Sequence, residues 1–311
     1  MLLRLCGNTH EFAIGQNSSI TICAAVGGGM EFTMKKAKII ILAGQSNAVG
    51  VGHNKYLSKH FDAATEERFR EGYDNILINY SSHAIKSNGF VKTRTNCTEA
   101  TKDTLGPEVG IARVLDAKCN GEQFFIVKCA FGGTGLCHDW LSESDPAHIS
   151  GVEVDFNKAI QFIEPTPAGW CYNELVRLLD ESIEILKRDG YEPTVHAFCW
   201  MQGENDAMNK ETTDAYIGRY ERLLGDLNVR FAPYFENCRY IEAGISEIWD
   251  FYKEMNENKR SYAEKSGHRY IDTLAAGLTT KNEPVEEPDT YHYDSDSIVK
   301  LGELFAEAII G

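Results

Sequence analysis

The chain has 311 residues, of which 43% are hydrophobic and 25% are charged, and its formal net charge is −15 at pH 7. This is the composition of an ordinary soluble globular protein, and so acidic a surface repels nucleic-acid phosphates and anionic lipid, so we expect neither as a partner. The nine cysteines include no C-x-x-C pair, which argues against a disulfide framework and a zinc site.

The first 36 residues are expected to form an N-terminal extension, and residues 37–311 to form one α/β domain. The N-terminus does not resemble a signal peptide, because polar and acidic residues follow Arg4 where an apolar stretch would be needed. No run reaches the roughly 20 apolar residues of a membrane span. These features and the unpaired cysteines predict a cytoplasmic location, while secretion stays open.

From residue 37 onward, apolar runs alternate with amphipathic stretches. Strands are expected at 38–43, 124–131, 195–201, 239–246 and 268–273. Helices are expected at 108–118, 170–190, 214–231, 248–267 and 297–310. Strands separated by helices of this length pair in parallel, so the sequence predicts a three-layer α/β/α sandwich with a mostly parallel, five-stranded sheet. The segments 52–104 and 137–169 are rich in Gly, Asn, Ser, Thr and Pro and are expected to form loops along a substrate cleft.

The residues that follow the first predicted strand are the first candidates for chemistry, because ligands bind beyond the carboxyl ends of parallel strands. Gly44 permits a tight turn there, and Ser46 then begins a helix, where free N–H groups favour developing negative charge. Ser46 is therefore a candidate nucleophile. It equally fits the role of a helix N-cap.

Two further strand ends carry polar or flexible residues. Gly132 and Gly133 follow the strand at 124–131, and two glycines let backbone N–H groups approach an oxyanion. The polar run 202–206 (QGEND) follows the strand at 195–201. Buried amides and carboxylates need partners, so this run indicates a site unless it is merely an exposed turn.

Near the C-terminus, Asp289 and His292 lie three residues apart in a loop ahead of the last predicted helix. At this spacing a carboxylate can hold the imidazole Nδ1–H and stabilise the imidazolium formed during proton transfer. The other eight histidines lack an acidic residue at this offset within such a loop, so they are expected to be surface or core residues.

Taken together, five blocks resemble the SGNH hydrolase superfamily, and more narrowly its carbohydrate esterase branch, with acetylxylan esterases and sialate O-acetylesterase-like proteins. The blocks are IIILAGQSNAVGVG (39–52), LGPEVGIARVL (105–115), CAFGGTGLCHDW (129–140), CWMQGENDA (199–207) and DTYHYDSDSIVKLG (289–302). The resemblance covers residues 37–311 and implies a flavodoxin-like sheet. Gly-Gln-Ser-Asn replaces the Gly-Asp-Ser that is common in the lipase branch.

The resemblance also implies roles for individual residues. Ser46 would be the nucleophile and His292 the general base and then acid, with either Asp289 or Glu204 orienting the imidazole. Ser46, Gly133 and Gln202 would form the oxyanion hole, although the wider superfamily carries Asn in the third block. Substrate contacts are expected from the neighbouring residues Gln45, Asn47, Gly132 and Thr134.

The implied activity is hydrolysis of O-acyl esters, most often O-acetyl, on a carbohydrate through an acyl-enzyme, with no metal or organic cofactor. A small-molecule or oligosaccharide ester is then the only partner expected. Two alternatives stay open: an esterase or thioesterase for non-sugar acyl esters, and a non-catalytic carbohydrate-binding relative. An α/β-hydrolase is disfavoured, because the chain has no G-x-S-x-G motif.

Overall fold

The computed structural model describes side chains for residues 34–83, 85–96, 103–151, 154–155, 158, 165–283 and 289–311. Before residue 34 it describes the backbone of four short strands, which pair as an antiparallel sheet in chain order. These strands are β1 (Leu5–Cys6), β2 (Thr9–Ala13), β3 (Ser19–Ala24) and β4 (Met30–Glu31).

A second, larger sheet organises the rest of the described chain. Its parallel strands are β5 (Lys35–Gly44), β7 (Tyr73–Ser82), β11 (Phe124–Ala130), β12 (Tyr191–Met201), β13 (Arg239–Ala243) and β14 (Arg269–Ile271). Two short strands, β8 (Ile85–Lys86) and β9 (Val91–Thr93), pair antiparallel with β7. The spatial order is β14-β13-β12-β5-β11-β7-β8, so β5 lies in the middle.

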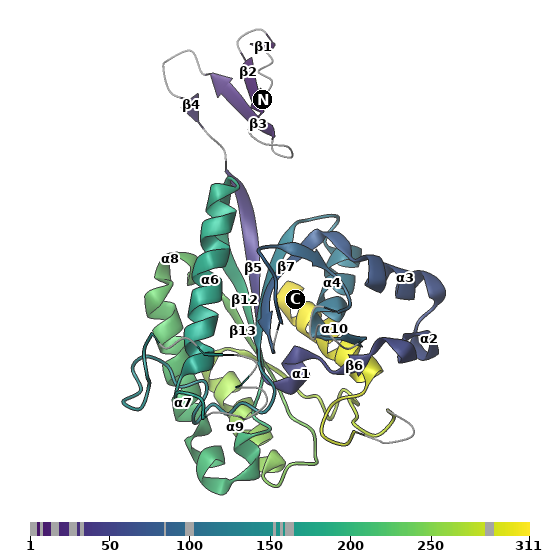
Figure 1. Ribbon diagram of the computed structural model, residues 1–311, viewed down its shortest axis with the longest axis vertical. Helices are drawn as coiled ribbons and strands as arrows, with labels where there is room; N and C mark the ends of the chain where they lie inside the picture. Colours follow the sequence, from purple (N-terminus) through teal and green to yellow (C-terminus); the bar gives the residue numbers. More distant parts are fainter. Residues whose placement is uncertain are drawn as a thin grey trace.

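Helices flank this sheet on both sides (Figure 1). On one side lie α6 (Trp170–Arg188), α7 (Lys210–Arg230), α8 (Ala232–Phe235) and α9 (Tyr252–Ser266). On the other side lie α2 (Leu57–His60), α3 (Ala63–Glu71), α4 (Pro107–Lys118) and α10 (Ser295–Ile310). The short elements are α1 (Ser46–Val49), η1 (Asn54–Tyr56), η2 (Asp206–Met208) and the paired strands β6 (Gly52–His53) and β10 (Thr104–Leu105). The predicted three-layer α/β/α sandwich is confirmed.

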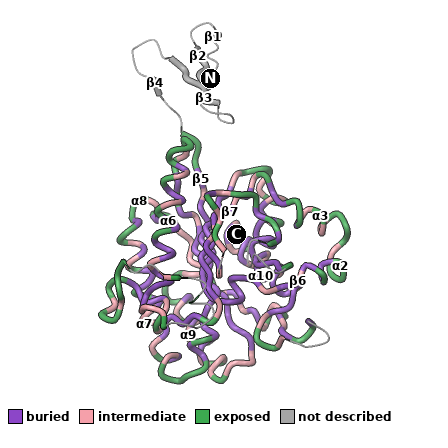
Figure 2. The backbone as a smooth tube through the Cα atoms, viewed as in Figure 1, coloured by how far each residue is buried: buried purple, intermediate pink, exposed green. Residues whose placement is uncertain are grey.

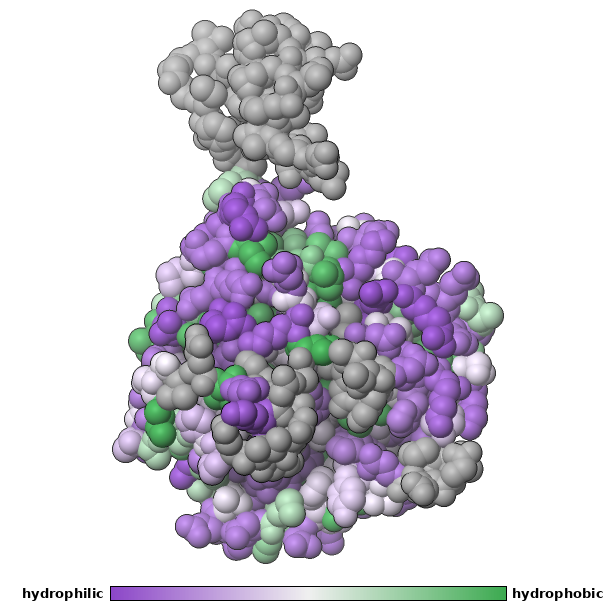
Figure 3. All heavy atoms as spheres, viewed as in Figure 1, coloured by the Kyte–Doolittle hydropathy of each residue, from purple (hydrophilic) through white to green (hydrophobic). Residues whose placement is uncertain are grey.

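The core lies on both faces of the central strands, which run through the middle of the molecule as buried backbone (Figure 2). All seven residues of β11 are buried, as expected for a strand covered on both faces. Figure 3 shows a largely hydrophilic outer face with small, scattered hydrophobic areas. Among the described helices, none is both long enough and apolar enough to cross a lipid bilayer.

The five predicted strands are all present, and they lie in the flavodoxin-like order β11-β5-β12-β13-β14. The predicted count of five was wrong, because β7 extends the sheet beyond β11 and carries β8 and β9. The prediction that 52–104 is mainly loop fails for the same reason. Asn79 interrupts the apolar run of β7, and its side chain is satisfied within the protein by Ser182 and Ser87, which the sequence does not reveal.

Candidate active site

The turn between β5 and α1 places Ser46 at the carboxyl edge of the sheet, in the middle of the strand order. Gly44 has φ +145°, and a Cβ there would lie only 1.8 Å from the carbonyl oxygen of Met201, so only glycine fits. The backbone N–H of Gln45 donates to that same carbonyl oxygen at 3.0 Å. Gln45 occupies the N-cap position and Ser46 is the first helical residue, so the N-cap interpretation of Ser46 was wrong.

His292 and Asp289 form the pair that their spacing predicts. The imidazole Nδ1 lies 2.6 Å from Asp289 Oδ2, and the Tyr291 N–H donates to the other carboxylate oxygen at 2.9 Å. Partial burial pushes the pKa of Asp289 upward, but the hydrogen bond and charge of His292 outweigh it and hold this pKa below its ordinary value. Asp289 is therefore a carboxylate near neutral pH, which suits it to orient the ring.

Asn47 connects the nucleophile segment to the histidine segment. Its Oδ1 accepts the backbone N–H of Tyr293 at 2.9 Å, and its Nδ2 donates to Glu204 Oε1 at 2.9 Å. Asn47 directly follows Ser46, and Tyr293 directly follows His292. The hydrogen bond between Asn47 and Tyr293 therefore holds the segment of Ser46 beside the segment of His292. Among the hydrogen bonds of the described residues, none joins the Ser46 hydroxyl to His292; such bonds often tighten only when substrate binds.

Glu204, the rival for the third position, has a different environment. Its side chain is fully buried, one oxygen accepts from Asn47, and in the described structure the other oxygen has no hydrogen-bond partner. Burial raises the pKa of this carboxyl. The structure thus places Asp289 at the imidazole Nδ1, while Glu204 holds the side chain of Asn47.

Gln202, predicted as an oxyanion donor, is buried with its amide nitrogen already engaged. Its Nε2 lies 2.7 Å from Asp206 Oδ2 and 3.2 Å from both Gln45 Oε1 and the Thr134 carbonyl. Two N–H groups facing three acceptors leave none for a substrate oxygen. The geometry therefore argues against the predicted oxyanion role. Gln202 instead links the segments that follow β5, β11 and β12.

Three of the four predicted substrate-binding residues likewise turn inward. Gln45 accepts from Gln202 and from the Asn205 N–H, and Asn47 is used as described above. Thr134 donates its hydroxyl to the Phe131 carbonyl at 2.7 Å and accepts from Trp140. These side chains shape the site instead of facing a ligand. Gly132 lies beside Ser46.

Lys259 is a buried lysine close to the buried carboxyl groups of Glu204, Asp206 and Glu242. It is fully buried on α9, and its Nζ donates to the Gln202 carbonyl at 2.7 Å and to the Ala243 carbonyl. Burial lowers the pKa of Lys259 to about 8, although the charges of Glu242, Glu204 and Asp206 act in the opposite direction. A buried cation therefore fixes the end of β12 close to these carboxyls.

Asn205 is a residue whose role the sequence interpretation missed. It is exposed, and its Nδ2 donates to the Gly133 carbonyl at 2.8 Å, which leaves a second amide hydrogen for another acceptor. Among the described residues, no backbone hydrogen bond uses the N–H of Ser46 or of Gly133. Ser46, Gly133 and Asn205 thus each offer an N–H group for another acceptor. The polar run 202–206 indicated a site in the sequence. Only the fold shows that the Asn205 amide, and not the Gln202 amide, is exposed.

This geometry defines the class. A serine at the carboxyl edge of a parallel sheet, unused N–H groups and a carboxylate-bound histidine from the C-terminal loop are the parts of a serine hydrolase site. The family model for carbohydrate esterases described as sialic acid-specific acetylesterases matches residues 36–311. The chain belongs to this family, and it is a carboxylic ester hydrolase that removes O-acetyl groups from carbohydrates.

Solved structures show the same fold at low sequence identity. A protein from Arabidopsis thaliana is 18% identical, covers 88% of this chain and 97% of its own, and has a TM-score of 0.58. NanS is 16% identical over 90% and 98% of the two chains, with a TM-score of 0.60. A carbohydrate acetylesterase from Xanthomonas citri is 14% identical over 94% and 60%, with a TM-score of 0.55. No curated protein matches the chain.

Proposed function

We propose that Ser46 carries the acyl group during catalysis, with His292 as its base and Asp289 as the orienting carboxylate. The observation that carries this proposal is the Asn47–Tyr293 hydrogen bond, which joins the residue after Ser46 to the residue after His292. The 2.6 Å contact between Asp289 and the imidazole supports the same assignment, because it leaves Nε2 as the ring nitrogen that can take a proton.

In the proposed reaction, His292 Nε2 accepts the Ser46 proton while the serine Oγ attacks the acetyl carbonyl carbon. The resulting oxyanion is stabilised by the N–H groups of Ser46 and Gly133 and by the free amide hydrogen of Asn205. The bond to the sugar oxygen breaks, and His292 gives its proton to that oxygen. A water molecule, deprotonated by His292, then attacks the acetyl-serine, the bond between Ser46 Oγ and the acyl carbon breaks, and His292 returns the proton to Ser46 Oγ as acetate leaves.

The substrate we propose is a small acetylated sugar or oligosaccharide. The chain as a whole is strongly acidic, with a formal net charge of −15 at pH 7. A neutral sugar approaches such a surface without electrostatic cost, whereas an anionic substrate is repelled by the net charge. We also propose residues 37–311 as the esterase domain, with 1–36 as an extension, and a cytoplasmic location, which the six free cysteines among the described residues support.

Ser46→Ala tests the assignment directly. We expect it to abolish turnover of p-nitrophenyl acetate and of acetylated xylo-oligosaccharides, with an unchanged circular dichroism spectrum. Ser142→Ala is a suitable control, because this buried serine lies outside the proposed machinery. Retention of most activity in Ser46→Ala refutes the proposed nucleophile.

A further inference from the structure

Tyr291 differs from the other aromatic residues because its side chain faces solvent. It is 61% exposed, and among the Phe, Tyr and Trp side chains that the structure describes, no other is more than partly exposed. Tyr291 also directly precedes His292, the proposed base. The exposed ring is therefore attached to the segment that carries the proposed chemistry.

A second aromatic residue places the Tyr291 ring at the border of the site. The ring packs against Trp249, with the two ring centroids 6.0 Å apart and the planes inclined by 42°. Trp249 lies in the loop after β13, and in this loop the Phe251 N–H donates to the Ala207 carbonyl at 2.9 Å. Ala207 is two residues beyond Asn205, the proposed oxyanion donor. The ring pair is thus tied to the base on one side and to the segment of that donor on the other.

The backbone around Tyr291 is held at several points. The Tyr291 N–H donates to Asp289 Oδ1 at 2.9 Å, and the next N–H but one, that of Tyr293, donates to Asn47 Oδ1 at 2.9 Å. The Tyr293 hydroxyl lies 3.5 Å from the carbonyl oxygen of Gly244, directly after β13. The position of the exposed ring is therefore set before a ligand arrives, which lowers the entropy cost of binding.

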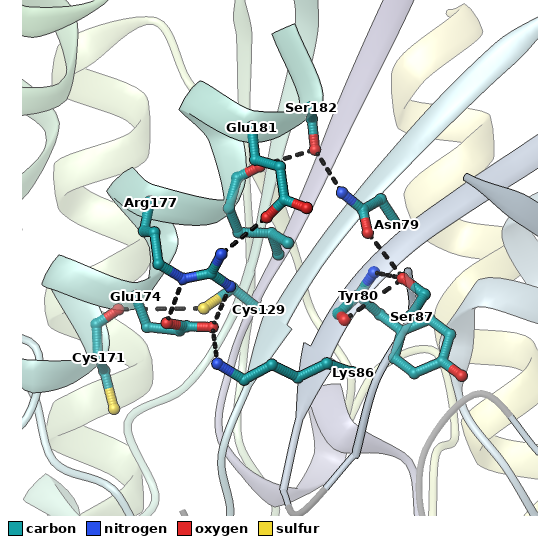
Figure 4. Close-up of polar contacts among 11 residues, drawn as sticks. Asn79, Tyr80, Lys86, Ser87, Cys129, Cys171, Glu174, Arg177, Glu181 and Ser182 are labelled. Atoms are coloured by element: carbon teal, nitrogen blue, oxygen red, sulfur yellow. Dashed lines mark hydrogen bonds and ion pairs between the residues drawn. The ribbon is translucent and has the colours of Figure 1, made fainter. Parts of the chain in front are cut away.

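On the other side of β5, polar side chains between β7 and α6 pair with one another (Figure 4). Lys86 and Arg177 both form ion pairs with Glu174, at 2.9 and 2.7 Å. Asn79 donates to Ser182 at 3.0 Å. These contacts hold the sheet to α6 and need no ligand, whereas most of the Tyr291 ring surface on the β13 side is open.

We propose that Tyr291 is a substrate-binding residue whose ring stacks on the sugar that carries the acetyl ester. The inference rests on the proposed roles of Ser46 and His292. A pyranose ring presents C–H groups on its faces and oxygen atoms at its edge, so it matches the apolar face and polar tip of a tyrosine. Stacking removes the apolar surface of both rings from water and requires no charge on the ligand. Tyr291 thus favours esters of sugars over esters of small alcohols.

The test compares Tyr291→Ala with Tyr291→Phe on two esters, peracetylated methyl β-xylopyranoside and ethyl acetate, by acetate release. Ethyl acetate has no ring, whereas the leaving group of p-nitrophenyl acetate also stacks on tyrosine. We expect Tyr291→Ala to lower kcat/KM for the sugar ester about tenfold, mainly through a higher KM, and to change kcat/KM for ethyl acetate less than about twofold. Tyr291→Phe keeps the aromatic face and should stay within about twofold of the wild type on both esters.

Tyr234→Ala is the matched control. Tyr234 lies on α8, which directly precedes β13 and so lies at the amino edge of the sheet, away from the proposed site. This variant should change kcat/KM for neither ester. The unfolding temperature of Tyr291→Ala should equal that of the wild type, because the side chain is exposed.

Three outcomes overturn the proposal. Equal losses on both esters in Tyr291→Ala mean that Tyr291 supports the acyl chemistry. An unchanged kcat/KM for the sugar ester means that the ring does not contact the carbohydrate, and an equal loss in Tyr291→Phe means that the hydroxyl is used instead of the ring face. Failure of the proposed function is seen separately, because Ser46→Ala would then retain activity on both esters.

Discussion

Asp289→Asn removes the negative charge that faces His292 and leaves the size of the side chain unchanged. In a fully buried serine-hydrolase triad such a change costs about 10⁴ in kcat, because the imidazole adopts the wrong tautomer. The side chain of Asp289 is 39% exposed, so water partly replaces the lost carboxylate. We therefore expect kcat at pH 7 to fall by about 10²–10³, equivalent to about 3–4 kcal/mol in the activation barrier.

Glu204→Gln is the matched comparison, since it also replaces a carboxylate by an amide. The Gln carbonyl oxygen can still accept from Asn47, so kcat should stay within about threefold of the wild-type value. Burial raises the pKa of Glu204, so the folded state holds this proton more tightly than the unfolded state does. The wild-type protein therefore loses stability as pH rises from the ordinary glutamate pKa of 4.5 through the raised pKa of Glu204, and the Gln variant lacks this loss.

Two measurements check the pair: steady-state hydrolysis of p-nitrophenyl acetate at pH 7, and thermal unfolding between pH 4.5 and 8. We expect the unfolding temperature of Glu204→Gln, minus that of the wild type, to increase as the pH rises from 4.5 to 8. The reasoning is refuted if Glu204→Gln loses as much kcat as we expect for Asp289→Asn while Asp289→Asn stays nearly fully active. Glu204 would then be the residue that supports His292.

Two further predictions concern the donors and the core. Asn205→Ala should lower kcat about 10²-fold with little change in unfolding temperature, because it removes one oxyanion donor from an exposed position; a kcat within threefold of wild type contradicts the donor role. Lys128→Met should lower the free energy of unfolding by about 3–5 kcal/mol, because Glu108 and the Val49 carbonyl lose their buried partner. Urea denaturation measures this change, and Lys118→Met is the control, because the exposed ion pair of Lys118 with Glu307 contributes little to the free energy of unfolding. Equal losses of unfolding free energy in the two variants would contradict the argument.

The sequence predicted most of the core strands because they are compact apolar runs that end in glycine or polar residues. It also predicted the contact of Asp289 with His292, since residues three apart within one loop meet locally. The order of these strands followed from the family resemblance. These successes depend on short-range patterns, which a single chain displays directly.

Several of the failures depend on contacts between distant segments. β7 was missed because the partner of Asn79 lies 103 residues away on α6. The orientation of Gln202 is set by Asp206 and by the Thr134 carbonyl, which the sequence does not place side by side. The sequence interpretation also gave Asn205 no role. Its side chain is exposed while the side chains of Glu204 and Asp206 are buried, and the sequence alone does not show this difference.

Labelling with a fluorophosphonate probe, followed by peptide mapping, tests the central claim most directly. The account predicts a single adduct on the Ser46 hydroxyl, formed much more slowly in His292→Ala and blocked by prior incubation with an acetylated sugar. An unlabelled protein that still hydrolyses p-nitrophenyl acetate, or an adduct on any other side chain, would contradict it.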